Sequence, residues 1–130
     1  MIMETVTSII QILIEFIKLF VLLGVPCHLV GDYVLQSDFI AKTKGENMYH
    51  LFVHSVLYCI PFGIVFVWAS GLWLPVALVY LAITHFAIDI LKTKNKITYL
   101  EDQAYHYVII YTLVIIFLSI KGEIWNDNYY

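Results

Sequence analysis

The chain has 130 residues, of which 62% are hydrophobic and 13% are charged, and its formal net charge is −3. A soluble domain of this length needs more polar surface, so the composition excludes that class and predicts one transmembrane helical domain over residues 1–130. The sequence contains no arginine, a residue that makes many phosphate and base contacts in nucleic-acid-binding proteins, so we expect no nucleic-acid partner.

The first predicted helix, Thr5 to Phe39, is too long for a simple crossing, because the apolar core of a bilayer takes only ~20 helical residues. The sequence LGVPC places a glycine and a proline in its middle, so we expect a kink or break near Gly24–Pro26. A polar stripe follows its first half: Glu4, Ser8, Gln11, Glu15 and Lys18. Residues 2–22 either cross the membrane with this stripe facing the other helices or lie on its surface, and we favour crossing.

Three further predicted helices cover Tyr49–Ala69, Leu72–Leu91 and Gln103–Ile120, and each is long and apolar enough to cross a bilayer. Short connections between long helices favour antiparallel neighbours. The predicted fold class is therefore all-α, an antiparallel four-helix bundle of a polytopic membrane protein.

The lysines predict the orientation of this bundle. They follow the first and third helices, at Lys42, Lys44, Lys92, Lys94 and Lys96, whereas the connection SGLW carries no charge. The positive-inside rule then places both lysine-containing loops in the cytoplasm and both termini outside, in a multi-pass protein of the inner (plasma) membrane. Aromatic residues agree with this layout: Trp68, Trp73 and Trp125 would mark the outer interface, and Tyr33, Tyr49, Tyr99 and Tyr105 the inner one.

Histidines and aspartates recur in pairs four residues apart, near the cytoplasmic side of every predicted helix. The pairs are His28–Asp32, His50–His54, His85–Asp89 and Asp102–His106, and Gln36 continues the first of them. This spacing puts both members of a pair on one face of a helix, and the faces of an antiparallel bundle can converge on one cavity. Ionisable groups are costly inside a membrane and usually mark a functional site.

Neutral imidazole together with carboxylate suits Zn²⁺, Fe²⁺ or Mn²⁺. We expect one or two divalent ions, and a pool of ligands consisting of His28, Asp32, His50, His54, His85, Asp89 and His106. Asp102 and Gln36 are expected to orient the ligands or act as a general base, and Lys92 to contact an anionic headgroup. The alternative is structural, with Asp32 and Asp89 paired to histidine or lysine between helices.

Four stretches, HLVGDYVLQSDFIAKTK, HLFVHSVLY, HFAIDILK and EDQAYH, resemble a family of small bacterial and phage membrane proteins of unknown function. The resemblance covers nearly the whole chain after about Leu22, with all four motifs intact, and it implies no activity. More loosely, the arrangement is similar to inner-membrane metal-dependent hydrolases, whose helices share His and Asp pairs with zinc phospholipase C-like enzymes. This second resemblance implies a zinc-type hydrolase.

Our leading hypothesis is a metal-dependent hydrolase that acts on a phosphoester or similar bond at the cytoplasmic leaflet. Its expected partners are the lipid bilayer and an anionic lipid or lipid-linked substrate. A transporter or proton relay could use the same side chains, but a path would also need polar residues in the outer half of the bundle. The oligomeric state stays open, since the two copies of a dimer could form a pore between them. A third alternative is a phage-type membrane interaction protein with a purely structural polar core.

Overall fold

The structure is a computed structural model that describes residues 2–70 and 73–126, and the side chains of residues 5–67 and 73–119. Its elements are α1 (Ile2–Ile17), the π-helical stretch η1 (Lys18–Gly24), α2 (Val25–Leu29), a second π-helical stretch η2 (Val30–Val34), α3 (Asp38–Thr43), α4 (Met48–Ser70), α5 (Trp73–Thr93) and α6 (Tyr99–Asn126). No strand occurs in the described ranges, and 4 helical segments are long and apolar enough to cross a membrane. The predicted all-α transmembrane fold is confirmed.

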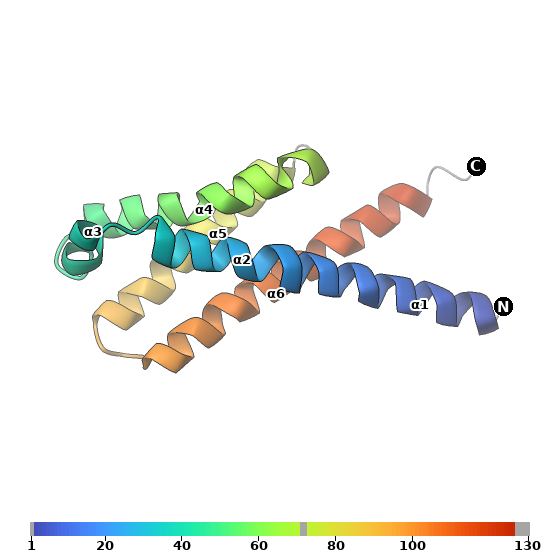
Figure 1. Cartoon of the computed structure of the whole chain (residues 1–130), viewed down its shortest axis with the longest axis horizontal. Coiled ribbons are helices and arrows are strands. Elements are labelled where there is room, and N and C mark those ends of the chain that lie inside the picture. Colours follow the sequence, from blue (N-terminus) through green and yellow to red (C-terminus); the bar gives the residue numbers. More distant parts are fainter. Residues whose placement is uncertain (1, 71–72, 127–130) are drawn as a thin grey trace.

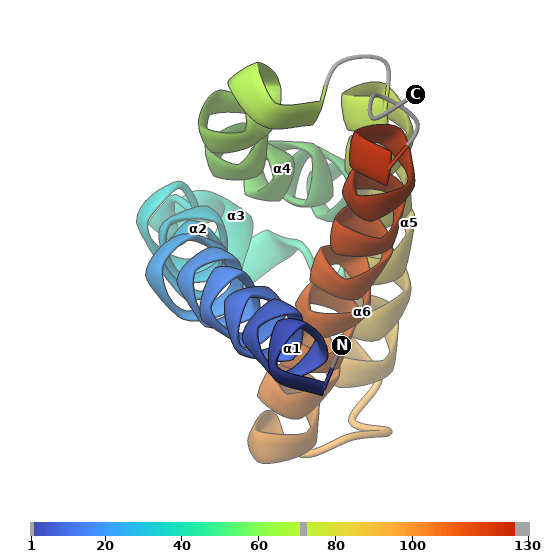
Figure 2. The same ribbon diagram turned by 90° about the vertical axis from the view of Figure 1, so that its right-hand side faces the viewer.

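The first helical segment lies across the other three long helices (Figures 1 and 2). Its first part, α1 and η1, packs on α6, whereas α2 and η2 pack on α4. The helices α4 and α5 are antiparallel neighbours, and α6 packs on α5. As a result, the chain reverses direction at each long helix, and the start of α1 lies at the opposite end of the molecule from α3 (Figure 1).

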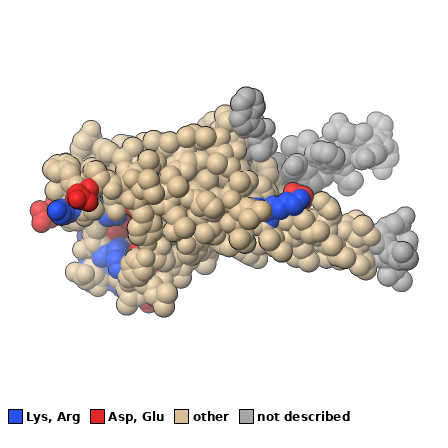
Figure 3. Space-filling view, in the orientation of Figure 1, with Lys and Arg blue, Asp and Glu red and all other residues tan. Residues whose placement is uncertain are grey.

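Charged side chains gather at the end of the molecule where α3 lies (Figure 3). The predicted inner-interface tyrosines and Trp73 are all exposed, as expected for side chains at a membrane–water interface. The side chains of Trp68 and Trp125 lie outside the described residues.

Local capping accounts for two of the helix boundaries that differ from the predicted ones. The first segment ends at Val34, before Phe39, and α3 starts anew after Ser37, whose hydroxyl accepts a hydrogen bond from the Ile40 amide at 3.3 Å. The last helix begins at Tyr99, before Gln103, because Thr98 and Glu101 form a capping box: the Thr98 amide donates to Glu101 Oε2 at 2.8 Å, and the Glu101 amide donates to Thr98 Oγ1 at 3.2 Å. Asp102 therefore lies in a helical first turn.

The chain does not break at Pro26. Instead, the helix widens on both sides of it, from Lys18 to Gly24 and again from Val30 to Val34. The Val25 amide donates to Phe20 O, five residues back, in the π-helical pattern. A proline ring collides with the carbonyl four residues earlier in an ordinary α-helix, and we attribute the wider turn before Pro26 to that collision.

The described residues of the polar stripe are exposed or partly exposed on the first segment, whereas a crossing segment was expected to turn them toward the other helices: Ser8, Gln11, Glu15 and Lys18. The side chain of Glu4 lies outside the described residues. Glu15 and Lys18 form an ion pair of 3.0 Å with side chains that are 39% and 54% exposed. The aromatic rings of Phe16 and Phe20 instead contact Tyr111 of α6, with ring centroids 5.0 and 6.1 Å apart. Apolar packing thus occupies the face of α1 that the stripe was expected to use.

Gly31 lets the backbones of the first segment and α4 approach closely. A Cβ atom on Gly31 would lie only 2.6 Å from the backbone oxygen of Tyr58, whereas one on Gly63 would meet Leu78 at an ordinary 3.5 Å. Small residues serve the same purpose in other membrane bundles. Gly31 precedes Asp32 directly, so the close approach also fixes where that carboxylate lies.

Gly31→Ala should lower the free energy of unfolding by about 1–3 kcal/mol, because the Tyr58 backbone must move to admit the methyl group. Gly63→Ala is the matched control: it should be neutral or raise stability by up to about 1 kcal/mol, since alanine favours a helix over glycine. Thermal unfolding of the detergent-purified proteins, followed by circular dichroism, measures both. Equal stabilities of the two variants would contradict the close approach.

Candidate metal centre

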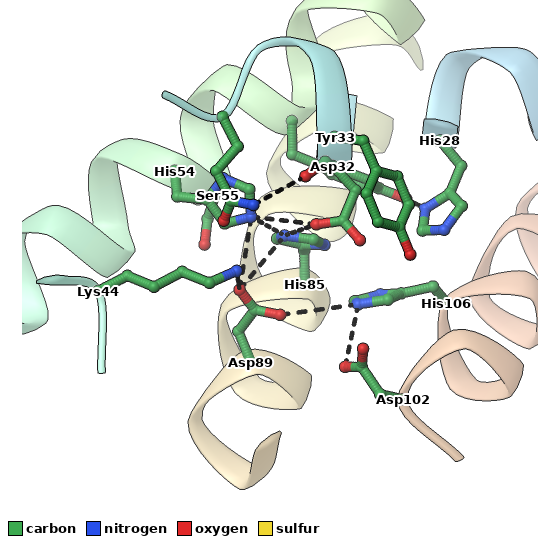
Figure 4. Close-up of polar contacts among 12 residues, drawn as sticks. His28, Asp32, Tyr33, Lys44, His54, Ser55, His85, Asp89, Asp102 and His106 are labelled. Atoms are coloured by element: carbon green, nitrogen blue, oxygen red, sulfur yellow. Dashed lines mark hydrogen bonds and ion pairs between the residues drawn. The ribbon is translucent and has the colours of Figure 1, made fainter. Parts of the chain in front are cut away.

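A polar cluster is buried where the first segment, α4, α5 and α6 meet (Figure 4). Its buried members are His28, Asp32, His54, Ser55, His85, Asp89, Asp102 and His106. The apolar core next to it contains Cys27, Tyr58, Cys59, Phe62, Leu81 and Ile110. The convergence expected from the paired spacings therefore takes place, because each of the four segments contributes at least one titratable side chain.

Four side chains from three helical segments form the first group. Asp32 Oδ1 lies 3.2 Å from His54 Nε2, which lies 3.1 Å from His85 Nε2. Asp32 Oδ1 is also 3.8 Å from His85 Nε2. Asp89 Oδ2 completes the group at 3.5 Å from His54 Nε2 and 3.7 Å from His85 Nε2.

These distances match the spacing of ligands around a small metal ion. Tetrahedral zinc binds nitrogen and oxygen at about 2.0–2.2 Å, which places neighbouring ligand atoms ~3.3 Å apart. A single N–H on His54 Nε2 can donate to only one of its three neighbours. A divalent cation between Asp32, His54 and His85, whose ligand atoms all lie within 4.8 Å of one another, would satisfy these atoms, and Asp89 is a further candidate ligand beside them.

The second group shares His85 and Asp89 with the first. His106 Nε2 lies 3.7 Å from Asp89 Oδ1 and 3.5 Å from Asp102 Oδ1. Ligand atoms of His85, Asp89 and His106 all lie within 4.8 Å of one another, as do those of Asp32, His54 and His85. Every side chain in the two groups is buried.

His28 lies beside these groups and holds other residues in place. Its Nδ1 is 3.2 Å from the Tyr58 hydroxyl, and its Nε2 is 3.0 Å from Gln103 Oε1. The Gln103 amide in turn donates to Asp102 Oδ2 at 3.1 Å. His28 therefore orients Asp102 through Gln103, as a partner of the ligands rather than a member of either group.

Two other predicted site residues lie outside both groups. His50 Nδ1 is 2.7 Å from the Thr43 hydroxyl, and its ring packs on Phe39, so it joins α4 to α3. The Gln36 amide donates to Asp32 O at 3.2 Å, while its Oε1 is buried and has no hydrogen-bond partner within the described part of the chain. Gln36 thus supports the segment that carries Asp32.

A different lysine reaches the cluster from the one predicted. Lys44 Nζ lies 2.7 Å from Asp89 Oδ2, and its side chain is 16% exposed. Lys92 instead places its Nζ over the ring of Tyr99, 5.3 Å from the centroid. The structural alternative is borne out to this extent: Asp32 pairs with a histidine and Asp89 with a lysine between helices.

Tyr58 is a further residue of the site that the sequence did not predict. Its ring stacks on His85 with centroids 3.8 Å apart and an angle of 12° between the planes, while its hydroxyl contacts His28. The stacking fixes the plane of the His85 ring and directs Nε2 toward the first group. An aromatic residue in an apolar helix gives no sequence signal for such a role.

A family model described as a protein of unknown function (DUF3307) matches residues 16–127. No curated protein and no solved structure matches the chain. The matched range includes both groups of buried side chains. It bears out the expected family of unknown function, whereas the resemblance to metal-dependent hydrolases stays a prediction.

Proposed function

This chain belongs to the DUF3307 family, whose function is unknown, and from its geometry we propose that it is a membrane-embedded, metal-dependent hydrolase. The observation that carries the proposal is the first group: two imidazole nitrogens 3.1 Å apart, each within 3.8 Å of a carboxylate oxygen of Asp32 and of Asp89, buried among apolar helices. Zinc is the preferred ion, because these nitrogen and oxygen ligands and their number suit it.

The charged end of the molecule supports a place for this site at the cytoplasmic leaflet. The predicted topology lysines lie in or next to α3 and at the connection from α5 to α6, and charged side chains gather at that end of the molecule (Figure 3). The cluster residues come from the adjoining parts of the helices: Asp32 from η2, His54 from the first half of α4, Asp89 from the end of α5 and Asp102 from the start of α6. Lysines on one side of a bundle indicate its cytoplasmic side and attract anionic lipid headgroups. The substrate proposed is therefore a phosphoester carried by a lipid.

A divalent ion in this group would polarise a phosphoryl oxygen and lower the pKa of a bound water. In the hydrolysis, the water oxygen forms a bond to phosphorus and the bond from phosphorus to the ester oxygen breaks. The proton that leaves the water ends on the departing alcohol. Lys44, the ammonium that contacts the group, would attract the negative phosphate, the role first expected of Lys92.

The apolar core supports a blind-ended site over a proton relay. Phe62, Ile110 and Val114 are buried between the cluster and the far end of the bundle. The Glu15–Lys18 pair is partly exposed on the outside of the first segment. Counting the ~20 residues of a bilayer core back from Val34 places this pair near the opposite interface, away from any path through the bundle.

The test is chelator-sensitive hydrolysis by the purified protein. Zinc-loaded protein in mixed micelles should release phosphate or a phosphorylated headgroup from phospholipids or isoprenyl phosphates, followed by phosphorus NMR. His85→Gln should abolish release and His50→Gln should retain it, because only His85 belongs to the metal groups. Absence of turnover together with proton flux into sealed vesicles would favour the relay.

Lys44→Met should tighten zinc binding by about 10- to 100-fold. A zinc ion on Asp89 would lie within ~5 Å of the Lys44 ammonium, where like charges repel by a few kcal/mol at an effective dielectric constant of about 20. Competition between zinc and a chelator measures the affinity. Lys42→Met is the control, because Lys42 is exposed, and the idea fails if both substitutions shift the affinity equally.

A further inference from the structure

Two buried atoms next to the first group have no hydrogen-bond partner among the described residues: Asp102 Oδ1 and His106 Nε2. They face each other across 3.5 Å, and their side chains are 8% and 2% exposed. An unpaired carboxylate oxygen in such a position costs free energy unless something satisfies it. Both atoms come from consecutive turns of α6, so the helix itself holds them together.

Asp89 directs its two oxygens toward different sides. Oδ2 lies 3.5 Å from His54 Nε2, in the first group, whereas Oδ1 lies 3.7 Å from His106 Nε2. A carboxylate in this position can bridge two cations. Hydrolytic sites with two metals hold them about 3.5–4 Å apart, close enough for one carboxylate to span them.

We infer that the cluster holds a second divalent ion, bound by Asp89 Oδ1, Asp102 Oδ1 and His106 Nε2 and linked to the first ion through Asp89. The inference rests on the proposed function, since it adds an ion to the same site. It gives Asp102 the role of a ligand in place of a general base. His28 and Gln103 then act as the hydrogen-bonded support that orients this ligand.

A second ion matches the charges of the cluster. Three carboxylates, those of Asp32, Asp89 and Asp102, are buried together, and Lys44 contacts only Asp89 among them. With a first ion against Asp32 and Asp89, Asp102 would have only His106 facing it, and that imidazole carries a charge only when protonated. With both ions bound, a phosphoester could be held between them, its attacking and leaving oxygens each next to one cation.

The experiment counts zinc in the purified chain. Wild-type protein in detergent is loaded with zinc, freed of loose metal and measured by elemental analysis, beside Asp102→Asn and His106→Gln. The expected result is two zinc ions per wild-type chain and one in each variant. Glu101→Gln is the matched control: Glu101 is the exposed neighbour of Asp102, and this variant should keep both ions.

The outcomes separate the two proposals. One ion in the wild type and in both variants would overturn the second site and leave the first. No ion in a folded, zinc-replete wild type would overturn the proposed function itself. Manganese provides a second measurement: its electron paramagnetic resonance spectrum should show two coupled ions in the wild type and the six lines of an isolated ion in either variant. An uncoupled spectrum in the wild type would contradict the bridge.

Discussion

His85→Gln is expected to remove the first zinc ion from the protein. His85 belongs to both groups of candidate ligands, and its Nε2 lies within 3.8 Å of Asp32 Oδ1, His54 Nε2 and Asp89 Oδ2. Glutamine has about the size of histidine but is a poor zinc ligand, so the first ion loses a ligand at the centre of the site. Elemental analysis after dialysis measures the loss.

His50→Gln is the matched control for this prediction. The two histidines undergo the same change, but His50 contacts Thr43 and Phe39, outside the cluster. The His50 variant should therefore hold as much zinc as the wild type. Circular dichroism of both variants checks that the helices persist. Equal zinc contents in two folded variants would contradict the assignment of His85.

Asp89→Asn is expected to lower the free energy of unfolding by about 3–5 kcal/mol, the usual cost of removing one partner from a buried ion pair. Asp89 makes the ion pair with Lys44 at 2.7 Å and also faces His54, His85 and His106. Asparagine leaves the Lys44 ammonium, only 16% exposed, beside a neutral amide. The loss should be measured with a chelator present, so that metal binding does not contribute.

Asp38→Asn provides the comparison, because Asp38 is an exposed residue in the first turn of α3. Its loss should cost less than about 1 kcal/mol, the usual contribution of a charge near a helix N-terminus. Adding zinc should stabilise Asp38→Asn as it does the wild type, and Asp89→Asn much less. Similar stabilities of the two variants in chelator would show that Asp89 does not hold the cluster together.

The sequence predicted that polar side chains from the four segments converge, but it did not predict the role of each histidine. The i, i+4 spacing correctly placed His85 with Asp89, because both lie on a regular part of α5. The same spacing does not bring His50 and His54 into one site. His50 lies one turn nearer to α3 and contacts Thr43 there, whereas His54 reaches the buried cluster. No helix at α3 was predicted, so nothing in the pattern could separate the two residues.

Lys44 shows why a contact between distant residues escapes a local pattern. It lies 45 positions before Asp89 in the chain, and only the fold of α3 against α4 brings the two together. Lys92, three positions after Asp89, looked like the better candidate, but its ammonium lies over Tyr99. Spacing along one helix predicts which residues share a face, whereas contacts through a connecting helix depend on packing.

The transmembrane helices could be predicted because their signal is hydropathy summed over many residues. Their ends depended on single side chains, such as Thr98 and Glu101 at the start of α6. The kink expected at Pro26 became two π-helical stretches, since glycine and proline predict a disturbed helix but not the form that the disturbance takes.

X-ray absorption at the zinc edge is the most direct test of the claim that side chains from separate helices bind one metal centre. The wild-type protein should show only nitrogen and oxygen ligands at about 2.0–2.2 Å, together with outer-shell scattering from imidazole, and His85→Gln should show less of this imidazole scattering. Sulfur at ~2.3 Å would assign the metal to Cys27 or Cys59 instead. A shell of oxygens without imidazole scattering would likewise contradict the account.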